Sequence, residues 1–480
     1  MTRLMSVSAL TNRGAPFALD RASAERLTGG RWLGTATAAT IHGATQDSRR
    51  VHPGCLFVCL PGAKVDGHDF AATAVGDGAA LILATRPVPV PVPVLVVADV
   101  TAALGVLAAE FRRRYAKDCV WIGVAGANGK TTTKELIAAA LAEHHQRARV
   151  HATKGNYNNQ LGLPLTILNT PSGCRAAVIE IGANHPGEVA ALAAIAQPTV
   201  GVIASIGPEH LEGFGSLEGV ARAESELFAA LPAGAAAIFG ATGLAEHAAA
   251  HGTTPGKLLE IVQSAAAGRQ LRIIDQAAIR GRTTADGLVI AHSGGETPLF
   301  LLGAHNLANA TAALAVAQAC GVPDAVAVAG LARVRPVAGR LVSKPCGRHT
   351  LLDDTYNANP ASMFAALDVL AGATGGKLAI LGAMGELGAA SEASHRQVGE
   401  RAARLGLPLF AVAAPAIAAG YRAAGGVACQ EVADPTAAVT ALTAPGVLCH
   451  PTTILVKASR SAALERVVAG LLHELGGQPC

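Results

Sequence analysis

The residues best suited to chemistry lie in one glycine-rich turn. The apolar run Val120–Val124 leads into Gly126-Ala-Asn-Gly-Lys-Thr131, and a segment of helical periodicity starts at Lys130. Backbone N–H groups of such a turn, backed by a helix N-terminus, form a site for anions. Lys130 can neutralise the β- and γ-phosphates of a nucleotide, and the Thr131 hydroxyl can bind Mg²⁺. A chance glycine turn is the alternative, but strand, turn, Lys-Thr and helix are in register, which favours a phosphate loop.

Two further candidates follow other strands of the same predicted sheet. Glu180 ends the apolar run 176–181, and His210 follows the run 199–205 after a short loop. Ligands bind beyond the carboxyl ends of parallel strands, so we expect both side chains near the phosphate loop. Alone, Glu180 would be an ordinary surface charge and His210 an ordinary loop histidine. Their shared position favours a metal site, although Mg²⁺ usually prefers oxygen ligands to histidine.

Alternating strand and helix patterns surround these residues. Continuous apolar strands between helices are typical of a buried, mostly parallel sheet. The expected strands are 120–124, 176–181, 199–205 and 235–239, and the expected helices are 130–143, 187–196 and 216–230. Residues 242–298 are less regular, and we expect a β-rich insertion there.

A hinge and a second βα series follow this region. After a predicted helix over 305–320 comes Arg333-Val-Arg-Pro-Val-Ala-Gly-Arg340, whose proline and glycine indicate a break between domains. The strands expected beyond it are 350–354, 377–381, 409–413 and 453–456. Near the other end of the chain, proline alternates with valine between Arg86 and Val94, which predicts an edge strand or a stiff connector.

The bulk composition narrows the class of protein. At 480 residues the chain is long enough for about three domains. Its uncharged runs are too short or too interrupted to cross a bilayer, and its start lacks a signal-peptide core, so we expect a cytoplasmic protein without membrane insertion. A net charge of +4 and 3% aromatic residues disfavour nucleic-acid binding. Nine scattered cysteines predict free thiols in a reducing compartment.

The motifs resemble the Mur ligase superfamily over nearly the whole chain. The resemblance rests on the phosphate loop and on the segment His305-Asn-Leu-Ala-Asn309. It implies ATP and Mg²⁺ as cofactors, with Asn306 and Asn309 facing the base, Arg340 contacting phosphates across the hinge and Asp354 holding the ribose. The residues implied to bind the nucleotide phosphates are Gly126, Ala127, Asn128, Gly129, Lys130, Thr131 and Thr132.

Within the superfamily, four segments are similar to the branch that adds D-alanyl-D-alanine to UDP-N-acetylmuramoyl-tripeptide. They are Gly155-Asn-Tyr-Asn-Asn159, Glu180-Ile-Gly-Ala-Asn-His-Pro-Gly-Glu188, His210-Leu-Glu-Gly-Phe-Gly-Ser216 and Asp353-Asp-Thr-Tyr-Asn-Ala-Asn-Pro360. The resemblance implies an amide ligase of peptidoglycan synthesis that uses these two substrates and an acyl-phosphate intermediate. We expect a monomer, although the sequence leaves the oligomeric state open. A sister ligase such as MurE or a folylpolyglutamate synthase remains an alternative, as does a nucleotide-binding scaffold without turnover.

The resemblance also assigns roles to individual side chains. Lys130, His210 and Arg340 are expected to be catalytic. Many Mur ligases carry a carbamoylated lysine fourteen residues after the metal histidine, and Glu224 occupies that position here as a permanent carboxylate or, alternatively, as a solvated helix charge. The expected metal ligands are Thr131, Glu180, His210 and Glu224, and the expected contacts to the UDP substrate are Ser48, Arg49, Asn158 and Asn159.

The predicted fold class is α/β with three domains. An N-terminal UDP-binding α/β domain is expected over residues 1–98, a central ATPase domain with a phosphate loop and a parallel sheet over 99–334, and a C-terminal Rossmann-like α/β domain over 335–480. Three alanines depart from the family's usual residues, and they are Ala127, Ala383 and Ala458. None of them removes an expected metal ligand or the phosphate lysine, so activity is still expected.

Overall fold

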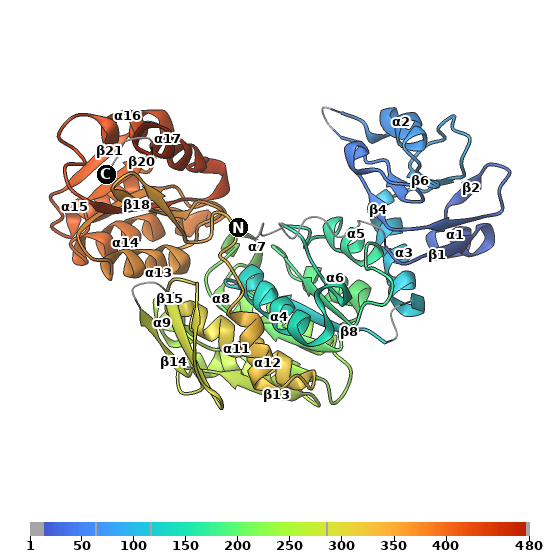
Figure 1. Cartoon of the computed structure of the whole chain (residues 1–480), viewed down its shortest axis with the longest axis horizontal. Coiled ribbons are helices and arrows are strands. Elements are labelled where there is room, and N and C mark those ends of the chain that lie inside the picture. Colours follow the sequence, from blue (N-terminus) through green and yellow to red (C-terminus); the bar gives the residue numbers. More distant parts are fainter. Residues whose placement is uncertain (1–13, 63–64, 116–117, 285–286, 477–480) are drawn as a thin grey trace, which may run out of the picture.

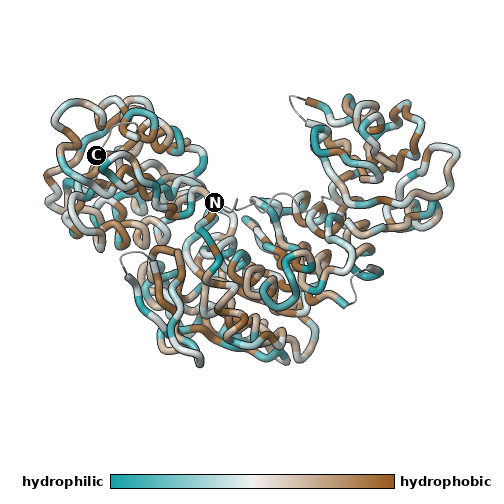
Figure 2. The backbone as a smooth tube through the Cα atoms, in the orientation of Figure 1, coloured by the Kyte–Doolittle hydropathy of each residue, from teal (hydrophilic) through white to brown (hydrophobic). Residues whose placement is uncertain are grey.

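The computed structural model of the chain describes residues 14–62, 65–115, 118–284 and 287–476. Three α/β bodies follow one another along the chain, and the first and last lie on opposite sides of the middle one (Figure 1). Hydrophobic segments run through the interior of each body, and hydrophilic segments form much of its outside (Figure 2). This confirms the α/β class and its three-part architecture.

The central body is built on a six-stranded sheet in which every neighbouring pair of strands is parallel. The strand order is β13-β12-β11-β8-β10-β9. The strands are β8 (Val120–Ala125), β9 (Val150–Ala152), β10 (Ala176–Glu180), β11 (Val200–Ile203), β12 (Ala236–Gly240) and β13 (Gln270–Ile274). The carboxyl ends of β8, β10 and β11 therefore lie side by side, as predicted, at the edge where the candidate residues lie.

Helices cover both faces of this sheet because successive strand residues point to opposite sides. On β8, Ile122 and Val124 pack toward α4 (Lys130–His145), α11 (His305–Ala319) and α12 (Asp324–Leu331). Trp121 and Ala125 pack on the other face. The helices of that face are α3 (Val100–Tyr115), α5 (Gly162–Leu168), α6 (Glu188–Ala196) and α8 (Leu217–Ala229).

The β-rich insertion predicted within 242–298 is confirmed in the second half of that region, whereas the first half is helical. That stretch forms two helices, α9 (Leu244–Ala250) and α10 (Pro255–Ala265), before β13 joins the central sheet. The Thr254 hydroxyl caps α10 and Pro255 occupies its first turn, which are ordinary helix-start signals. Only the second half is a separate antiparallel sheet, of β14 (Gly281–Thr284), β15 (Gly287–His292) and β16 (Gly295–Leu299).

The N-terminal body contains a two-stranded and a five-stranded sheet. The smaller sheet pairs β1 (Phe17–Asp20) antiparallel with β3 (Ala38–Ile41), and helices α1 (Arg21–Thr28) and α2 (Ala71–Gly76) accompany the sheets. The sheet order is β2 (Arg31–Leu33), β7 (Val94–Val96), β6 (Leu81–Ala84), β5 (Leu56–Val58) and β4 (Ala44–Thr45). The proline-rich segment before β7 has no regular structure. Of the two predicted alternatives, an edge strand and a connector, it is therefore the connector.

Helix α3 connects the first body to the second. It packs on α1 of the N-terminal body and on α5 and α6 of the central one. Its Phe111 ring meets Phe17 edge-on at 5.7 Å between centroids, and Leu104 and Leu107 are fully buried in the same core. The domain boundary at residue 98 stays a prediction. Helix α3, which follows it, belongs to a core that the N-terminal and central bodies share.

The C-terminal body is a second six-stranded sheet, ordered β17-β18-β22-β19-β20-β21, in which only β17 is antiparallel. Its strands are β17 (Val342–Cys346), β18 (His349–Asp354), β19 (Gly376–Gly382), β20 (Leu409–Val412), β21 (Cys429–Val432) and β22 (Thr452–Lys457). Its helices are α13 (Pro360–Ala371), α14 (Ser391–Arg404), α15 (Pro415–Ala423), α16 (Pro435–Thr443) and α17 (Glu465–Leu475). Across the described part of the chain, no helix has both the length and the apolar character to cross a membrane, and the cysteines there are free thiols.

Candidate active site

The phosphate loop joins the end of β8 to the start of α4. Gly126 and Gly129 both have positive φ, at 118° and 83°. A Cβ on Gly129 would lie 2.5 Å from Asn309 Oδ1 on α11. Asn309 in turn donates from Nδ2 to Asn306 Oδ1 at 2.8 Å. The loop therefore packs directly on α11, so closely that any side chain at position 129 would clash with Asn309.

We expect Gly129→Ala to lose roughly 1–3 kcal/mol of stability, because the new Cβ adds backbone strain and a clash with Asn309. It should also weaken ADP binding, since the loop must move. Gly252→Ala is the matched control, because Gly252 also has positive φ, at 67°, but no atom within 4 Å of its Cβ position. Thermal unfolding and calorimetric ADP titration would measure both effects. Equal stability loss in the two variants, with normal ADP binding by Gly129→Ala, would contradict the proposed packing.

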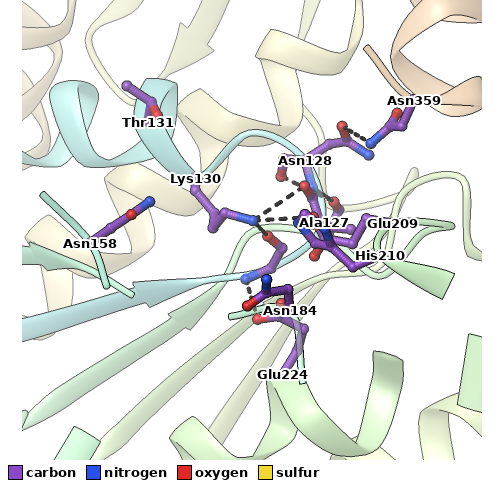
Figure 3. Close-up of polar contacts among 12 residues, drawn as sticks. Ala127, Asn128, Lys130, Thr131, Asn158, Asn184, Glu209, His210, Glu224 and Asn359 are labelled. Carbon is purple, nitrogen blue, oxygen red and sulfur yellow. Dashed lines mark hydrogen bonds and ion pairs between the residues drawn. The ribbon is translucent and has the colours of Figure 1, made fainter. Parts of the chain in front are cut away.

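Lys130 has its ammonium folded back onto its own loop. Nζ donates to Gly126 O at 2.5 Å and to Ala127 O at 3.4 Å, and it lies 3.3 Å from Glu209 Oε2. Figure 3 shows the side chain turned toward Ala127 and Glu209. A bound phosphate would have to replace these carbonyl and carboxylate partners.

Three buried carboxyl groups surround this lysine, and they belong to Glu180, Glu209 and Glu224. Burial lowers the pKa of Lys130, but the three nearby acids outweigh that effect and raise it overall, so the ammonium stays charged. Burial also raises the pKa of Glu209, and repulsion from Glu224 adds to the rise. A second buried lysine, Lys134, lies 3.9 Å from Glu180 Oε2, so the three carboxyl groups face two ammonium groups.

Glu180 and Thr131 meet where β10 ends and α4 begins. Thr131 Oγ1 donates to Glu180 Oε1 at 3.3 Å, and Asn158 Nδ2 donates to the same oxygen at 2.9 Å. The other oxygen, Oε2, is buried without a hydrogen-bond partner and lies 3.9 Å from Lys134 Nζ. The hydroxyl and the free carboxylate oxygen are the kind of donors that a hard cation takes.

Glu224 is not the solvated helix charge that was one of its two interpretations. Its residue is only 1% exposed, and Oε2 accepts from the Gly126 N–H at 2.5 Å. Its neighbour Glu226 lies on the outside and accepts from the Gly187 and Ala190 N–H groups at the start of α6. The solvated-charge interpretation of Glu224 is therefore wrong, and the metal-ligand interpretation stays a prediction.

Three contacts bring the C-terminal body onto this loop. Arg340 Nη2 donates to Thr131 Oγ1 at 3.3 Å, and the guanidinium stacks over the Tyr356 ring at 4.2 Å from its centroid. Asn359 Nδ2 donates to Asn128 Oδ1 at 2.9 Å (Figure 3). The third contact lies beside the loop, between His210 and Glu386, with 2.6 Å from Nδ1 to Oε2.

The hinge carries the residues expected to hold the nucleoside. Asn306, Thr132 and Arg340 line one small cleft together with Leu302 and Pro336. Asp354 accepts from the Leu341 N–H at 3.1 Å and forms an ion pair with the buried Lys457 at 2.7 Å. The cleft thus gathers Asn306 and Arg340, whereas Asn309 lies against the loop.

The four residues predicted to contact UDP divide into two pairs on different bodies. Ser48 and Arg49 lie in a short 3-10 turn after β4, where Arg49 forms a salt bridge to Asp47 at 2.8 Å. Asn158 and Asn159 lie before α5 in the central body. There Asn158 bonds Glu180, and Asn159 accepts from the Gly162 N–H at 2.9 Å. Asn158 therefore belongs to the phosphate side of the site.

Sequence reasoning missed three polar residues here. Glu209 directly precedes His210 in a loop after a parallel strand, a position that signals function. Lys134 lies one helical turn after Lys130, and its buried ammonium donates to Thr153 O at 2.7 Å. Ser205 bonds the Asn128 N–H at 2.9 Å, which steadies the loop beside Ala127. Among the described residues, no three His, Cys, Asp or Glu side chains form a metal site by themselves.

Comparisons with known proteins give this site a family. Residues 40–112 match the catalytic domain of the Mur ligase family, 124–317 its middle domain and 339–460 its glutamate ligase domain. The chain is 39% identical to the UDP-N-acetylmuramoyl-tripeptide–D-alanyl-D-alanine ligase of Escherichia coli strain K12, over 90% of this chain and 94% of that one.

Solved structures agree with this assignment. MurF from Acinetobacter baumannii superposes with a TM-score of 0.81 at 30% identity, covering 96% of this chain and all of that one. MurF ligase from Thermotoga maritima in complex with ADP gives a TM-score of 0.74 at 27% identity, covering 90% and 98%. The chain belongs to the Mur ligase family, in its UDP-N-acetylmuramoyl-tripeptide–D-alanyl-D-alanine ligase branch.

Proposed function

We propose that this protein joins D-alanyl-D-alanine to UDP-N-acetylmuramoyl-tripeptide, with conversion of ATP to ADP and phosphate, in peptidoglycan precursor synthesis. The observation that carries the proposal is the phosphate loop of the central body facing Arg340 and Asn359 of the C-terminal body. The relatives and structures that match over most of the chain are ligases of this name. We further propose that it acts as a monomer in the cytoplasm.

The chemistry requires an activated carboxyl group. A carboxylate does not react with an amine at neutral pH, because oxide would have to leave. Transfer of the γ-phosphoryl group onto the substrate carboxylate gives an acyl phosphate and ADP. The amine of D-alanyl-D-alanine then attacks the acyl carbon, the C–O bond to phosphate breaks, and the amide, phosphate and a proton are released.

The protein's own groups position and neutralise charge in these steps. We infer that the Lys130 ammonium leaves the carbonyls of its loop and binds the β- and γ-phosphates. The loop N–H groups hold the phosphate oxygens, and Arg340 reaches the transferred group from across the hinge. Burial keeps these charges in a low-dielectric site, where they act more strongly than in water.

Mg²⁺ fits the residues present. Thr131 and Glu180 would hold one ion, and His210 with Glu224 would hold a second; bound, the ions would offset the negative charge of the phosphates and the attacking carboxylate. The buried Glu180 Oε2 and Glu209 Oε1, which have no hydrogen-bond partner, support this.

We expect the protein to compact when both substrates bind. The N-terminal and C-terminal bodies lie on opposite sides of the central one (Figure 1), and the UDP and nucleotide contacts are expected on different bodies. Small-angle scattering with a non-hydrolysable ATP analogue plus UDP-tripeptide should therefore show a smaller radius of gyration. UDP-tripeptide alone is the control. An unchanged radius with both ligands would refute closure.

ADP release with different acceptors tests the proposed function. The enzyme would receive ATP, Mg²⁺ and UDP-N-acetylmuramoyl-tripeptide, in lysine and diaminopimelate forms, with D-alanyl-D-alanine, glutamate, diaminopimelate or no amine. We expect release only with D-alanyl-D-alanine. Two further assays test the alternatives. ADP release with UDP-N-acetylmuramoyl-dipeptide and diaminopimelate would indicate a MurE-type ligase, and release with folate and glutamate would indicate a folylpolyglutamate synthase. No ADP release with any pair of substrates would indicate a scaffold.

A further inference from the structure

His210 and Glu386 face each other from different bodies with unusual backbone conformations. His210 precedes the short helix α7 (Leu211–Phe214) of the central body, and Glu386 lies in the loop after β19. Both have positive φ, at 45° and 59°. Non-glycine residues adopt this conformation at a cost, which persists at sites where the surroundings impose it, often functional ones. Two such residues in one contact indicate that the surrounding structure imposes this contact.

The loop around Glu386 lies closely against α7. A Cβ on Gly388, which also has positive φ, would be 3.4 Å from the Cβ of Glu212 on α7. The His210 ring packs edge-on against Phe214, with 6.3 Å between centroids. The imidazole therefore has an apolar neighbour on its own helix and an acidic neighbour delivered by the other body.

The two ring nitrogens of His210 face different groups. Nδ1 is buried and makes no hydrogen bond, and the Glu386 carboxylate lies beside it at 2.6 Å. Nε2 lies on the side of Glu209, 3.9 Å from Oε2, and that oxygen is itself 3.3 Å from Lys130 Nζ. Nε2 is thus the nitrogen directed toward the phosphate loop.

We propose that Glu386 is a positioning residue for His210. Its carboxylate accepts the proton on Nδ1, which fixes the neutral tautomer whose Nε2 carries a lone pair toward the phosphate loop. In many proteins, a carboxylate that accepts from one ring nitrogen orients the imidazole so that the other nitrogen can bind a metal. The effect of Glu386 on metal binding by His210 rests on the proposed function. If that function holds, the metal site is complete only while the C-terminal body contacts the central body.

The alternative is an interdomain ion pair with no effect on His210. Glu386 is 63% exposed in its side chain, and exposed pairs usually contribute little. The two cases differ in the tautomer of His210. If Glu386 accepts the proton of the buried Nδ1, His210 is in the Nδ1–H tautomer. Without such an acceptor we expect the Nε2–H tautomer, which a free imidazole favours in water.

The test uses ¹⁵N-histidine-labelled full-length protein without nucleotide, at a pH where imidazole is neutral. Long-range ¹H–¹⁵N spectra would report the His210 tautomer, assigned by loss of its signals in His210→Gln. We expect Nδ1–H in the wild type and in Glu386→Gln, whose amide oxygen still accepts. Glu386→Ala should shift the population toward Nε2–H. Glu392→Ala, which removes a carboxylate on the exposed surface of α14, is the matched control and should not change it.

A second readout is Mn²⁺ binding in the presence of a non-hydrolysable ATP analogue, followed by electron paramagnetic resonance. We expect Glu386→Ala to weaken Mn²⁺ affinity by about tenfold or more, and Glu386→Gln and Glu392→Ala to stay near wild type. A wild-type tautomer in Glu386→Ala, or unchanged Mn²⁺ affinity in that variant, would overturn the proposal. Failure of wild-type ADP release with D-alanyl-D-alanine would instead refute the proposed function, and the tautomer result would stand apart from it.

Discussion

Lys130→Ala should reduce D-alanyl-D-alanine-dependent ADP formation by about 10³-fold while the chain stays folded. The ammonium is the phosphate-facing positive charge of the loop, and its contacts are carbonyl oxygens and Glu209 rather than core side chains. Its loss removes charge compensation in the transition state. Initial rates of ADP release at saturating ATP and UDP-tripeptide would measure the effect.

The control for this variant is Lys257→Ala, since Lys257 is an exposed lysine of α10 that pairs with Glu218 at 3.2 Å. It should keep wild-type rates. Circular dichroism and thermal unfolding in Mg²⁺ would show that Lys130→Ala is folded despite the acids left around the vacant position. Near-normal turnover by a folded Lys130→Ala protein would remove the phosphate-loop assignment.

Glu224→Gln should lower activity by about 10²-fold, and bicarbonate should not restore it. The glutamine oxygen can still accept from the Gly126 N–H, so the loop keeps its shape while the negative charge is lost. If the charge serves a second Mg²⁺, Glu224→Lys should regain part of the activity when CO₂ is supplied, because a carbamoylated lysine again carries an anionic oxygen.

Glu226→Gln separates this effect from a general loss of acid on α8. Glu226 accepts from the Gly187 and Ala190 N–H groups at the start of α6, away from the loop, and an amide oxygen can replace it in part. Its activity should stay within a few fold of wild type. Full activity of Glu224→Gln at both low and high Mg²⁺ would show that the buried carboxylate supports the loop and binds no ion.

The sequence predicted those parts of the site that lie within one βα unit. The apolar run before Gly126 and the helical segment from Lys130 are local patterns, and β8 and α4 form where they predict. Glu180 was found for a similar reason, because the end of a parallel strand places a side chain at a known edge. Helices α9 and α10 within residues 242–298 were not predicted, because short helices carry weak periodicity, although Thr254 and Pro255 marked a helix start.

Contacts between bodies could not be predicted in the same way. Asn359 has a local role as the cap of α13, where its Oδ1 accepts from the Ser362 N–H at 2.9 Å. Its bond to Asn128 depends on how the C-terminal body docks, which no local pattern encodes. Glu386 is hidden for the same reason. Helical periodicity did not predict the burial of Glu224 either. Glu226, only two residues away, is half-buried and accepts from N–H groups at the start of α6.

Helix α3 has a consequence for recombining this protein with its relatives. Phe17 and Phe111 close one core across the junction of the first two bodies, so a chimaera cut at residue 98 would pair a helix from one parent with a surface from another. Mismatched methyl groups in such a core cost about 1 kcal/mol each. Among the described residues, the buried clusters on either side of 334–339 are separate, and only the half-buried Leu302 of the central body packs against a C-terminal one. In chimaeras between relatives, the first two bodies should therefore be exchanged together as one unit, and the C-terminal body is the second unit.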